Sequence, residues 1–189
     1  MKADSSSRRQ YWLHIGGNFL LFQLLWPAAI FGAVAGSSHW SLAVLALMVL
    51  HGVLFGHNQR ADAIMLFSGL LIGVLFESAL LAAGLIEYRL QFSAALPPVW
   101  ILALWLGFAQ TFNHSLGWLR RHLPLAALLG GSASVVSLFW GIHFGAADTT
   151  QPWLLGVAYA VGWALMVPLL AWLSRSLERR GEQQGVWLQ

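Results

Sequence analysis

Six long apolar runs dominate the sequence and restrict the chain to a helical fold inside a membrane. A transmembrane helix needs about 20 mostly apolar residues to cross the roughly 30 Å of hydrocarbon in a bilayer. Only 9% of the 189 residues are charged. We therefore expect an all-α, polytopic membrane helix bundle with six transmembrane helices. The predicted helices cover residues 11–34, 39–55, 63–84, 98–119, 123–143 and 152–174.

The basic residues predict the orientation of this bundle. With the N-terminus in the cytoplasm, nine of the ten Lys and Arg residues lie on the cytoplasmic side and only Arg89 lies outside. This asymmetry is typical of inner-membrane proteins. We expect one integral membrane domain, with residues 1–10 and 175–189 as short cytoplasmic tails. Nucleic acid is excluded as a partner, because no basic patch alternates with exposed aromatic residues.

The N-terminal segment also resembles a secretory signal peptide. Basic residues precede an apolar stretch that ends in an Ala-Val-Ala sequence at 33–35. This stretch is longer than a usual signal core and contains Asn18, Gln23 and Pro27. We therefore expect the first helix to be retained rather than cleaved.

Glu77 is the ionisable residue that the predicted spans place deep in the hydrocarbon. At 1.5 Å per residue it lies about 22 Å from Asp62 at the inner edge, on the helical face that carries Gly69 and Gly73. Its chemistry fits a proton carrier or a general acid, and an interhelical hydrogen bond is the structural alternative. His143 is the candidate partner, because it lies at a similar depth.

A second group of polar residues lies in the cytoplasmic half. Gln110, Asn113 and His114 are three or four residues apart and share one face of the fourth predicted helix. His51 lies at a similar depth. Such groups fit either the binding of a lipid headgroup, a carbonyl or water, or simple hydrogen bonding between helices. The ligand-binding candidates are Asn18, Gln23, Gln110, Asn113 and His143, and the catalytic candidates are Glu77, His114 and His51.

We expect no metal and no cofactor. No acidic residue is predicted at the depth of His114, and the spaced histidine boxes of membrane di-iron enzymes are absent. The chain has no cysteine, which excludes thiol chemistry. It also lacks a glycine-rich phosphate loop and a nucleophile elbow.

Charged residues in the two predicted cytoplasmic loops are candidates for binding a lipid headgroup. Arg60, Arg120 and Arg121 offer the guanidinium groups that bind phosphate, with Asp62 beside them. The alternative is that the arginines only anchor the topology and that Arg60 pairs with Asp62.

Two segments resemble a bacterial family of unknown function. They read N-F-L-L-F-Q-L-L-W at 18–26 and P-P-V-W-I-L-A-L-W at 97–105, the latter continuing to H-S-L at 114–116. Asp62 and the acidic residue at position 77 also fit, although the family pattern has an aspartate where this chain has a glutamate. The resemblance implies a small multi-pass inner-membrane protein of Gram-negative bacteria, encoded near cyclopropane-fatty-acid synthase and lipid-modification genes.

Three functions follow as expectations. The first is a lipid-binding protein or an accessory to a lipid-modifying enzyme, as the resemblance implies, with membrane lipids as partners. The second is a lipid-active membrane enzyme that uses intramembrane acid–base residues. The third is a small proton-coupled transporter with Glu77 as the proton carrier. Enzymatic activity, the ligand and the oligomeric state stay open at this point.

Overall fold

The computed structural model describes residues 5–56 and 58–186, and the side chains of residues 11–56 and 58–179. The described residues form six α-helices, which confirms the all-α prediction. The outer ends of the predicted tails, residues 1–4 and 187–189, lie outside the described residues. The elements are α1 (Ser5–Val34), α2 (His39–Phe55), α3 (Gln59–Ala82), β1 (Glu87–Tyr88), α4 (Val99–Thr111), the 3-10 helix η1 (Gly117–Arg121), α5 (Leu123–His143), β2 (Ala147–Asp148) and α6 (Pro152–Val186).

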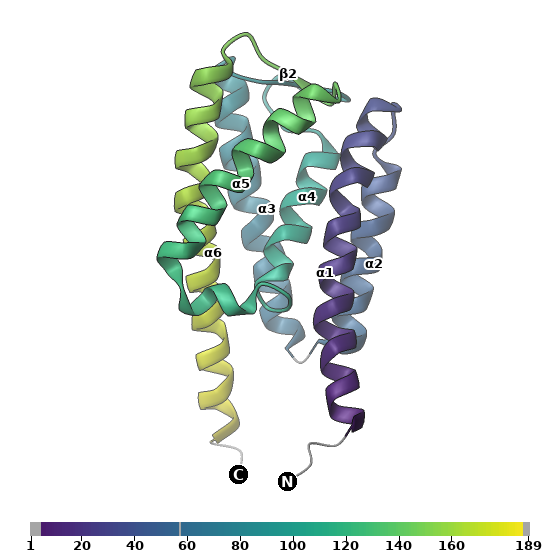
Figure 1. The fold of residues 1–189 in the computed structure, drawn as a ribbon, viewed down its shortest axis with the longest axis vertical. Helices are drawn as coiled ribbons and strands as arrows, with labels where there is room; N and C mark the ends of the chain where they lie inside the picture. Colours follow the sequence, from purple (N-terminus) through teal and green to yellow (C-terminus); the bar gives the residue numbers. More distant parts are fainter. Residues whose placement is uncertain (1–4, 57, 187–189) are drawn as a thin grey trace.

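Successive helices run up and down along one long axis (Figure 1). The α3–α4 pair is central, with the α1–α2 pair on one side and the α5–α6 pair on the other. The beginning of α1 and the end of α6 lie at the same end of the bundle, and β2 lies at the opposite end. α4 packs against α1, α2 and α3. Residues that follow α4 are therefore surrounded by protein.

Four helices are long and apolar enough to cross a membrane: α1 from Tyr11, α3, α5, and α6 as far as Arg179. In each, only 33% of the most apolar window is buried inside the bundle. Large apolar side chains such as Phe67, Leu128 and Leu165 consequently point outward. An outer surface this apolar suits lipid rather than water. The other two helices are apolar but shorter, with 17 residues in α2 and 13 in α4.

The helix boundaries agree with the prediction in part. α2 and α5 begin and end where the sequence predicts, whereas α6 continues to Val186, well past the predicted end. α3 begins at Gln59, four residues early, because Asn58 caps it: the Asn58 side-chain oxygen accepts a hydrogen bond from the Ala61 amide at 3.0 Å. The predicted cytoplasmic tail 175–189 is thus helical up to residue 186.

The predicted fourth helix, 98–119, is wrong at its C-terminal end. α4 ends at Thr111, and turns connect it to η1. The Phe112 carbonyl accepts a hydrogen bond from the Ser174 hydroxyl on α6 at 3.1 Å, instead of one from a further helical turn. Irregular backbone at membrane depth is tolerated where protein buries it. The early end of α4 frees the following polar residues to face other helices.

A short pairing between two loops was not predicted from the sequence. β1 and β2 pair antiparallel, with Glu87 opposite Asp148 and Tyr88 opposite Ala147. Because Tyr88 is buried in this pairing, its side chain reaches into the bundle beneath the loops.

Candidate functional site

A chain of ionisable side chains lies where α4 ends. His114 is at its centre: its Nδ1 is 2.5 Å from His14 Nε2, and its Nε2 is 3.1 Å from Asp62 Oδ1. The contact with Asp62 is at ion-pair distance, although the ring nitrogen does not point along a hydrogen bond. We call His14, Asp62, Asn113, His114 and Ser174 the His–Asp cluster.

The carboxylate of this cluster is fixed from two further elements. Asn113 Nδ2 donates a hydrogen bond of 2.7 Å to Asp62 Oδ1, and Ser174 Oγ lies 2.7 Å from Asn113 Oδ1. Asp62 is only 8% exposed. A carboxylate that faces an imidazole can orient the ring and stabilise its charged form, while two imidazoles in contact can pass a proton. The arrangement is therefore suited to acid–base chemistry.

Further buried polar side chains surround this cluster. Asn18 Oδ1 accepts a hydrogen bond of 2.6 Å from the Ser115 hydroxyl, and Gln110 Nε2 donates one of 3.2 Å to the Met48 carbonyl. A Cβ atom on Gly52 would lie 3.7 Å from His114 Nε2 and would collide with the Gln110 amide. The absence of a side chain at Gly52 thus lets α2 approach the end of α4.

Several polar atoms in this region lack a partner. In the described part of the chain, six buried side-chain nitrogen or oxygen atoms make no hydrogen bond. Three of them lie in this region and are in no ion pair either: Asn18 Nδ2, His51 Nδ1 and Gln110 Oε1. The set contains both donors and acceptors. It can therefore bind a polar group that carries both.

A second buried centre surrounds Glu77, which is 2% exposed. Its Oε2 accepts a hydrogen bond of 2.5 Å from the Tyr88 hydroxyl, and its Oε1 accepts one of 2.9 Å from Trp105 Nε1. The Tyr159 hydroxyl lies 3.1 Å from Glu77 Oε2 and 2.8 Å from the Tyr88 hydroxyl. We call these four residues the Glu77 cage.

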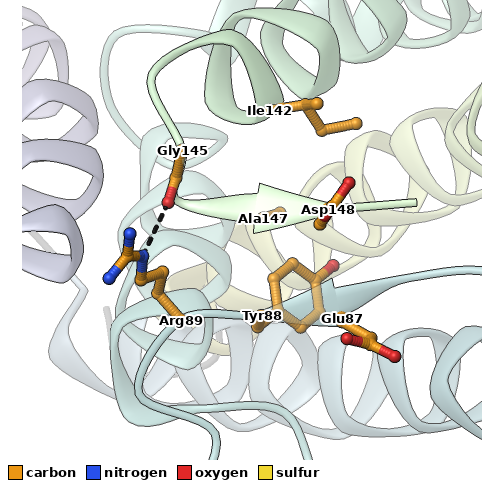
Figure 2. Close-up of a pocket in the computed structure, with 7 residues that line it drawn as sticks. All are labelled: Glu87, Tyr88, Arg89, Ile142, Gly145, Ala147 and Asp148. Carbon is orange, nitrogen blue, oxygen red and sulfur yellow. Dashed lines mark hydrogen bonds between the residues drawn. The ribbon is translucent and has the colours of Figure 1, made fainter.

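A pocket of about 410 Å³ lies at the end of the bundle where β1 pairs with β2. Figure 2 shows its lining residues, among them Tyr88 of β1, and the Arg89 side chain donates a hydrogen bond of 3.0 Å to the Gly145 carbonyl. Tyr88 belongs to both the pocket and the Glu77 cage. Burial, and next the nearby Glu77 carboxylate, raise the pKa of Tyr88 well above its usual value, so its hydroxyl keeps its proton.

The structure brings together most of the residues predicted for the second polar group. Asn18, Gln110, Asn113 and His114 are buried or half-buried around the end of α4, and the half-buried His51 lies beside them. Their mutual arrangement differs from the prediction, because Asn113 and His114 lie in the turn after α4 rather than on a helix.

Two predicted site residues do not belong to either centre. Gln23 is exposed on α1. His143 is also exposed, and its ring contacts Trp140 and Phe144 rather than Glu77. The predicted pairing of Glu77 with His143 is therefore wrong. Glu77 instead turns toward the tyrosines, which supply hydroxyl donors without a charge.

Asp62 is a third correction. It does not pair with Arg60, which is exposed, but points inward to His114. An acidic residue thus does lie at the depth of His114, contrary to the prediction. Arg121 is exposed, and Arg120 forms an ion pair of 3.2 Å with Glu178. In the described residues, no group of three His, Asp or Glu side chains is arranged to hold a metal ion.

Sequence analysis missed five residues of these two centres: His14, Ser174, Tyr88, Tyr159 and Trp105. His14 lies one helical turn before Asn18, and this spacing was the available signal. The chain has only three tyrosines, and two of them, Tyr88 and Tyr159, contact Glu77. Trp105 lies deep in an apolar helix, where an indole N–H needs a partner. Only the fold brings Tyr88, Tyr159 and Trp105 to the carboxyl group of Glu77.

One comparison with known proteins identifies the family. A family model described as a protein of unknown function matches residues 15–169. The chain belongs to the DUF2878 family. No curated protein matches it, and no solved structure does.

The matched DUF2878 region contains most of the residues described above. It includes the whole Glu77 cage, and it includes Asp62, Asn113 and His114 of the His–Asp cluster. His14 and Ser174 lie just outside the matched residues. The central carboxylate–imidazole contact is therefore internal to the DUF2878 region.

Proposed function

We propose that the chain crosses the bacterial inner membrane six times, with both termini in the cytoplasm. The distribution of the basic residues supports this orientation. The start of α1 and the end of α6 at one end of the bundle are compatible with an even number of spans (Figure 1). α2 and α4 are about 26 and 20 Å long at 1.5 Å per residue. They cross beside α1 and α3, which pack against them.

Within this topology, we propose that the chain binds the polar end of a membrane lipid beside the His–Asp cluster and supports a lipid-modifying enzyme. The observation that carries the proposal is the group of three unpaired buried atoms, Asn18 Nδ2, His51 Nδ1 and Gln110 Oε1. Each unpaired buried polar atom costs about 1–3 kcal/mol. A lipid ester or hydroxyl group would supply the missing partners, and the exposed Arg60 and Arg121 are available for a phosphate.

The test compares the same change at a buried and at an exposed glutamine. Gln110→Met removes the unpaired Oε1 atom, whereas Gln23→Met removes an exposed amide. Each protein is purified from its membrane, and the bound lipid is quantified by mass spectrometry. We expect wild type and Gln23→Met to retain one lipid class, and Gln110→Met to lose roughly tenfold in occupancy, as one lost hydrogen bond predicts. Equal lipid retention by the two variants would contradict lipid binding at this site.

One specific observation favours a second function: Asp62 contacts His114, and His114 in turn contacts His14. In an acid–base enzyme, Asp62 would orient the His114 ring, and the two imidazoles would take a proton from a lipid and return it. His14 is half-buried on α1, so it is the most exposed of these three side chains. The substrate in this case is the same lipid that binds beside the cluster.

Lipid analysis of cells separates the two functions. The lipids of a deletion strain are compared with those of strains that carry wild type, His114→Gln or the control His143→Gln. For an enzyme, we expect His114→Gln to match the deletion strain while the purified variant still binds lipid. For a binding protein, we expect the lipid profile of the cells to change only in strains whose purified variant has lost its bound lipid. An unchanged lipid profile in the deletion strain would contradict both functions.

A further inference from the structure

We infer that Glu77 is a proton-binding site that exchanges protons with the aqueous phase at the β1–β2 end of the bundle, by way of Tyr88. This site is separate from the His–Asp cluster: it lies fifteen residues further along α3, about 22 Å away at 1.5 Å per residue. The inference concerns a different end of the molecule from the proposed lipid site. It stands or falls independently of lipid binding.

The Glu77 cage can satisfy the carboxyl group in either charge state. For a carboxylate, Tyr88, Tyr159 and Trp105 supply three donors to its two oxygens. For the neutral acid, Glu77 Oε2 carries the proton and donates to the Tyr88 oxygen, Tyr88 donates to the Tyr159 oxygen at 2.8 Å, and Tyr159 donates to Glu77 Oε1 at 3.3 Å. The two arrangements differ in the position of the carboxyl proton and in the direction of the Tyr88 hydroxyl. A buried group that gains or loses a proton needs such a rearrangement, because an unpaired polar atom is costly.

In the part of the chain whose side chains the structure describes, no cationic group contacts Glu77. The groups that face it are a tyrosine from β1, a tryptophan from α4 and a tyrosine from α6, all uncharged. In the described part of the chain, the two ion pairs are His114–Asp62 and Arg120–Glu178, both outside the cage. A buried carboxyl group without a cationic partner is neutralised most directly by a proton.

The pocket provides the route to water. Tyr88 is the residue shared by the pocket and the cage, and its side chain lies at the centre of the lining in Figure 2. The other charged groups at the pocket are Glu87 on β1, Asp148 on β2 and Arg89, which follows β1. In the exchange step, the Tyr88 oxygen takes a proton from a hydronium ion in the pocket, which leaves as water, while the hydroxyl proton of Tyr88 passes to Glu77 Oε2. The reverse step releases the proton, so Tyr88 is unchanged after each exchange.

Infrared difference spectroscopy on the full chain in lipid nanodiscs tests this inference. The C=O band of a protonated carboxyl group is recorded between about pH 9 and pH 4, a range that brackets the usual carboxyl titration. We expect a band that grows as the pH falls, is lost in Glu77→Gln and persists in Glu87→Gln, which removes an exposed carboxyl group of the pocket. A wild-type spectrum without a pH-dependent band that Glu77→Gln removes would overturn the proton-binding site.

The Tyr88 route has its own test. Deuterium exchange into the Glu77 carboxyl band is timed in wild type, Tyr88→Phe and Tyr159→Phe, and thermal unfolding checks that each variant is folded. We expect Tyr88→Phe to slow exchange roughly a hundredfold, the usual effect of losing a positioned proton-transfer group. Tyr159→Phe should slow it much less, because Tyr159 is not a lining residue of the pocket. Equal exchange rates in folded wild type and Tyr88→Phe would overturn the route.

Discussion

Two serines on α6 differ in burial and in what their hydroxyl groups contact. Ser174 is 1% exposed and lies within hydrogen-bond distance of the Phe112 carbonyl and of Asn113 Oδ1. Ser176, two residues later, bonds to the Trp172 carbonyl of its own helix. The first hydroxyl joins α6 to the end of α4, whereas the second joins nothing beyond its helix. Ser176 is therefore a control on the same helix that makes no hydrogen bond to another element.

We predict that Ser174→Ala destabilises the protein by about 1–3 kcal/mol, because it leaves buried acceptors without their donor. Ser176→Ala should change the stability by less than about 0.5 kcal/mol. Thermal unfolding of both variants in the same detergent checks the difference. Equal unfolding temperatures would mean that the end of α4 is held without help from Ser174.

For single residues, the sequence was a better guide to the polar residues of the two centres than to the partners that these residues contact. Glu77 stood out as a carboxyl group in an apolar run and Asp62 as an acid beside the loop arginines, and both are buried. Their partners come from positions far along the chain, such as Tyr159, which is 82 residues from Glu77. Periodicity relates residues within one helix. It carries no information about which face of another helix lies opposite.

The contact between α3 and α4 depends on two glycines. A Cβ atom on Gly69 would lie 2.9 Å from the Trp105 carbonyl oxygen, and one on Gly73 would lie 2.8 Å from Cδ1 of the Trp105 indole. Both glycines let the helices approach closely, as small residues do in membrane bundles. The lack of a side chain on Gly73 also leaves room for the Trp105 indole, which donates a hydrogen bond to Glu77.

We predict that Gly73→Ala costs about 1–3 kcal/mol, because the added methyl group overpacks this contact. Gly16→Ala on α1 is the matched control, since a Cβ atom there meets nothing within 4 Å. Alanine is the better helix former, so this control should be neutral or stabilising by up to about 1 kcal/mol. Unfolding in detergent checks both variants, and loss of the Trp105–Glu77 contact in Gly73→Ala should also change tryptophan fluorescence. A Gly73→Ala variant as stable as Gly16→Ala would contradict close packing of α3 on α4.

The elements themselves were predicted to different degrees, for physical reasons. Apolar runs bounded by Gly, Ser and Pro gave the limits of α2 and α5 correctly. The end of α4 was missed because residues 112–116 satisfy their polar groups through α1, α3 and α6, which local sequence does not reveal. The β1–β2 pairing was missed because two residues per strand leave no periodic pattern.

For the whole molecule, the number of spans gives a direct prediction. The chain contains no cysteine, so single cysteines can be introduced at exposed positions and labelled with a membrane-impermeant maleimide. With six spans, Ala94→Cys and Thr150→Cys react in intact spheroplasts, whereas Gln59→Cys and Arg121→Cys react only after permeabilisation. If α2 and α4 do not cross, Gln59→Cys reacts from outside and Ala94→Cys does not. That pattern would contradict the six-span topology.

One helix carries both ionisable centres, and this has a mechanical consequence. Asp62 lies in the first turn of α3, and Glu77 lies near the other end. α1 and α6 contain Pro27 and Pro168, where helices bend, whereas α3 contains no proline. The two acids are thus attached to one helix without a proline break. A slide or rotation of α3 as a whole would move both acids together, and so would couple the two ends of the molecule.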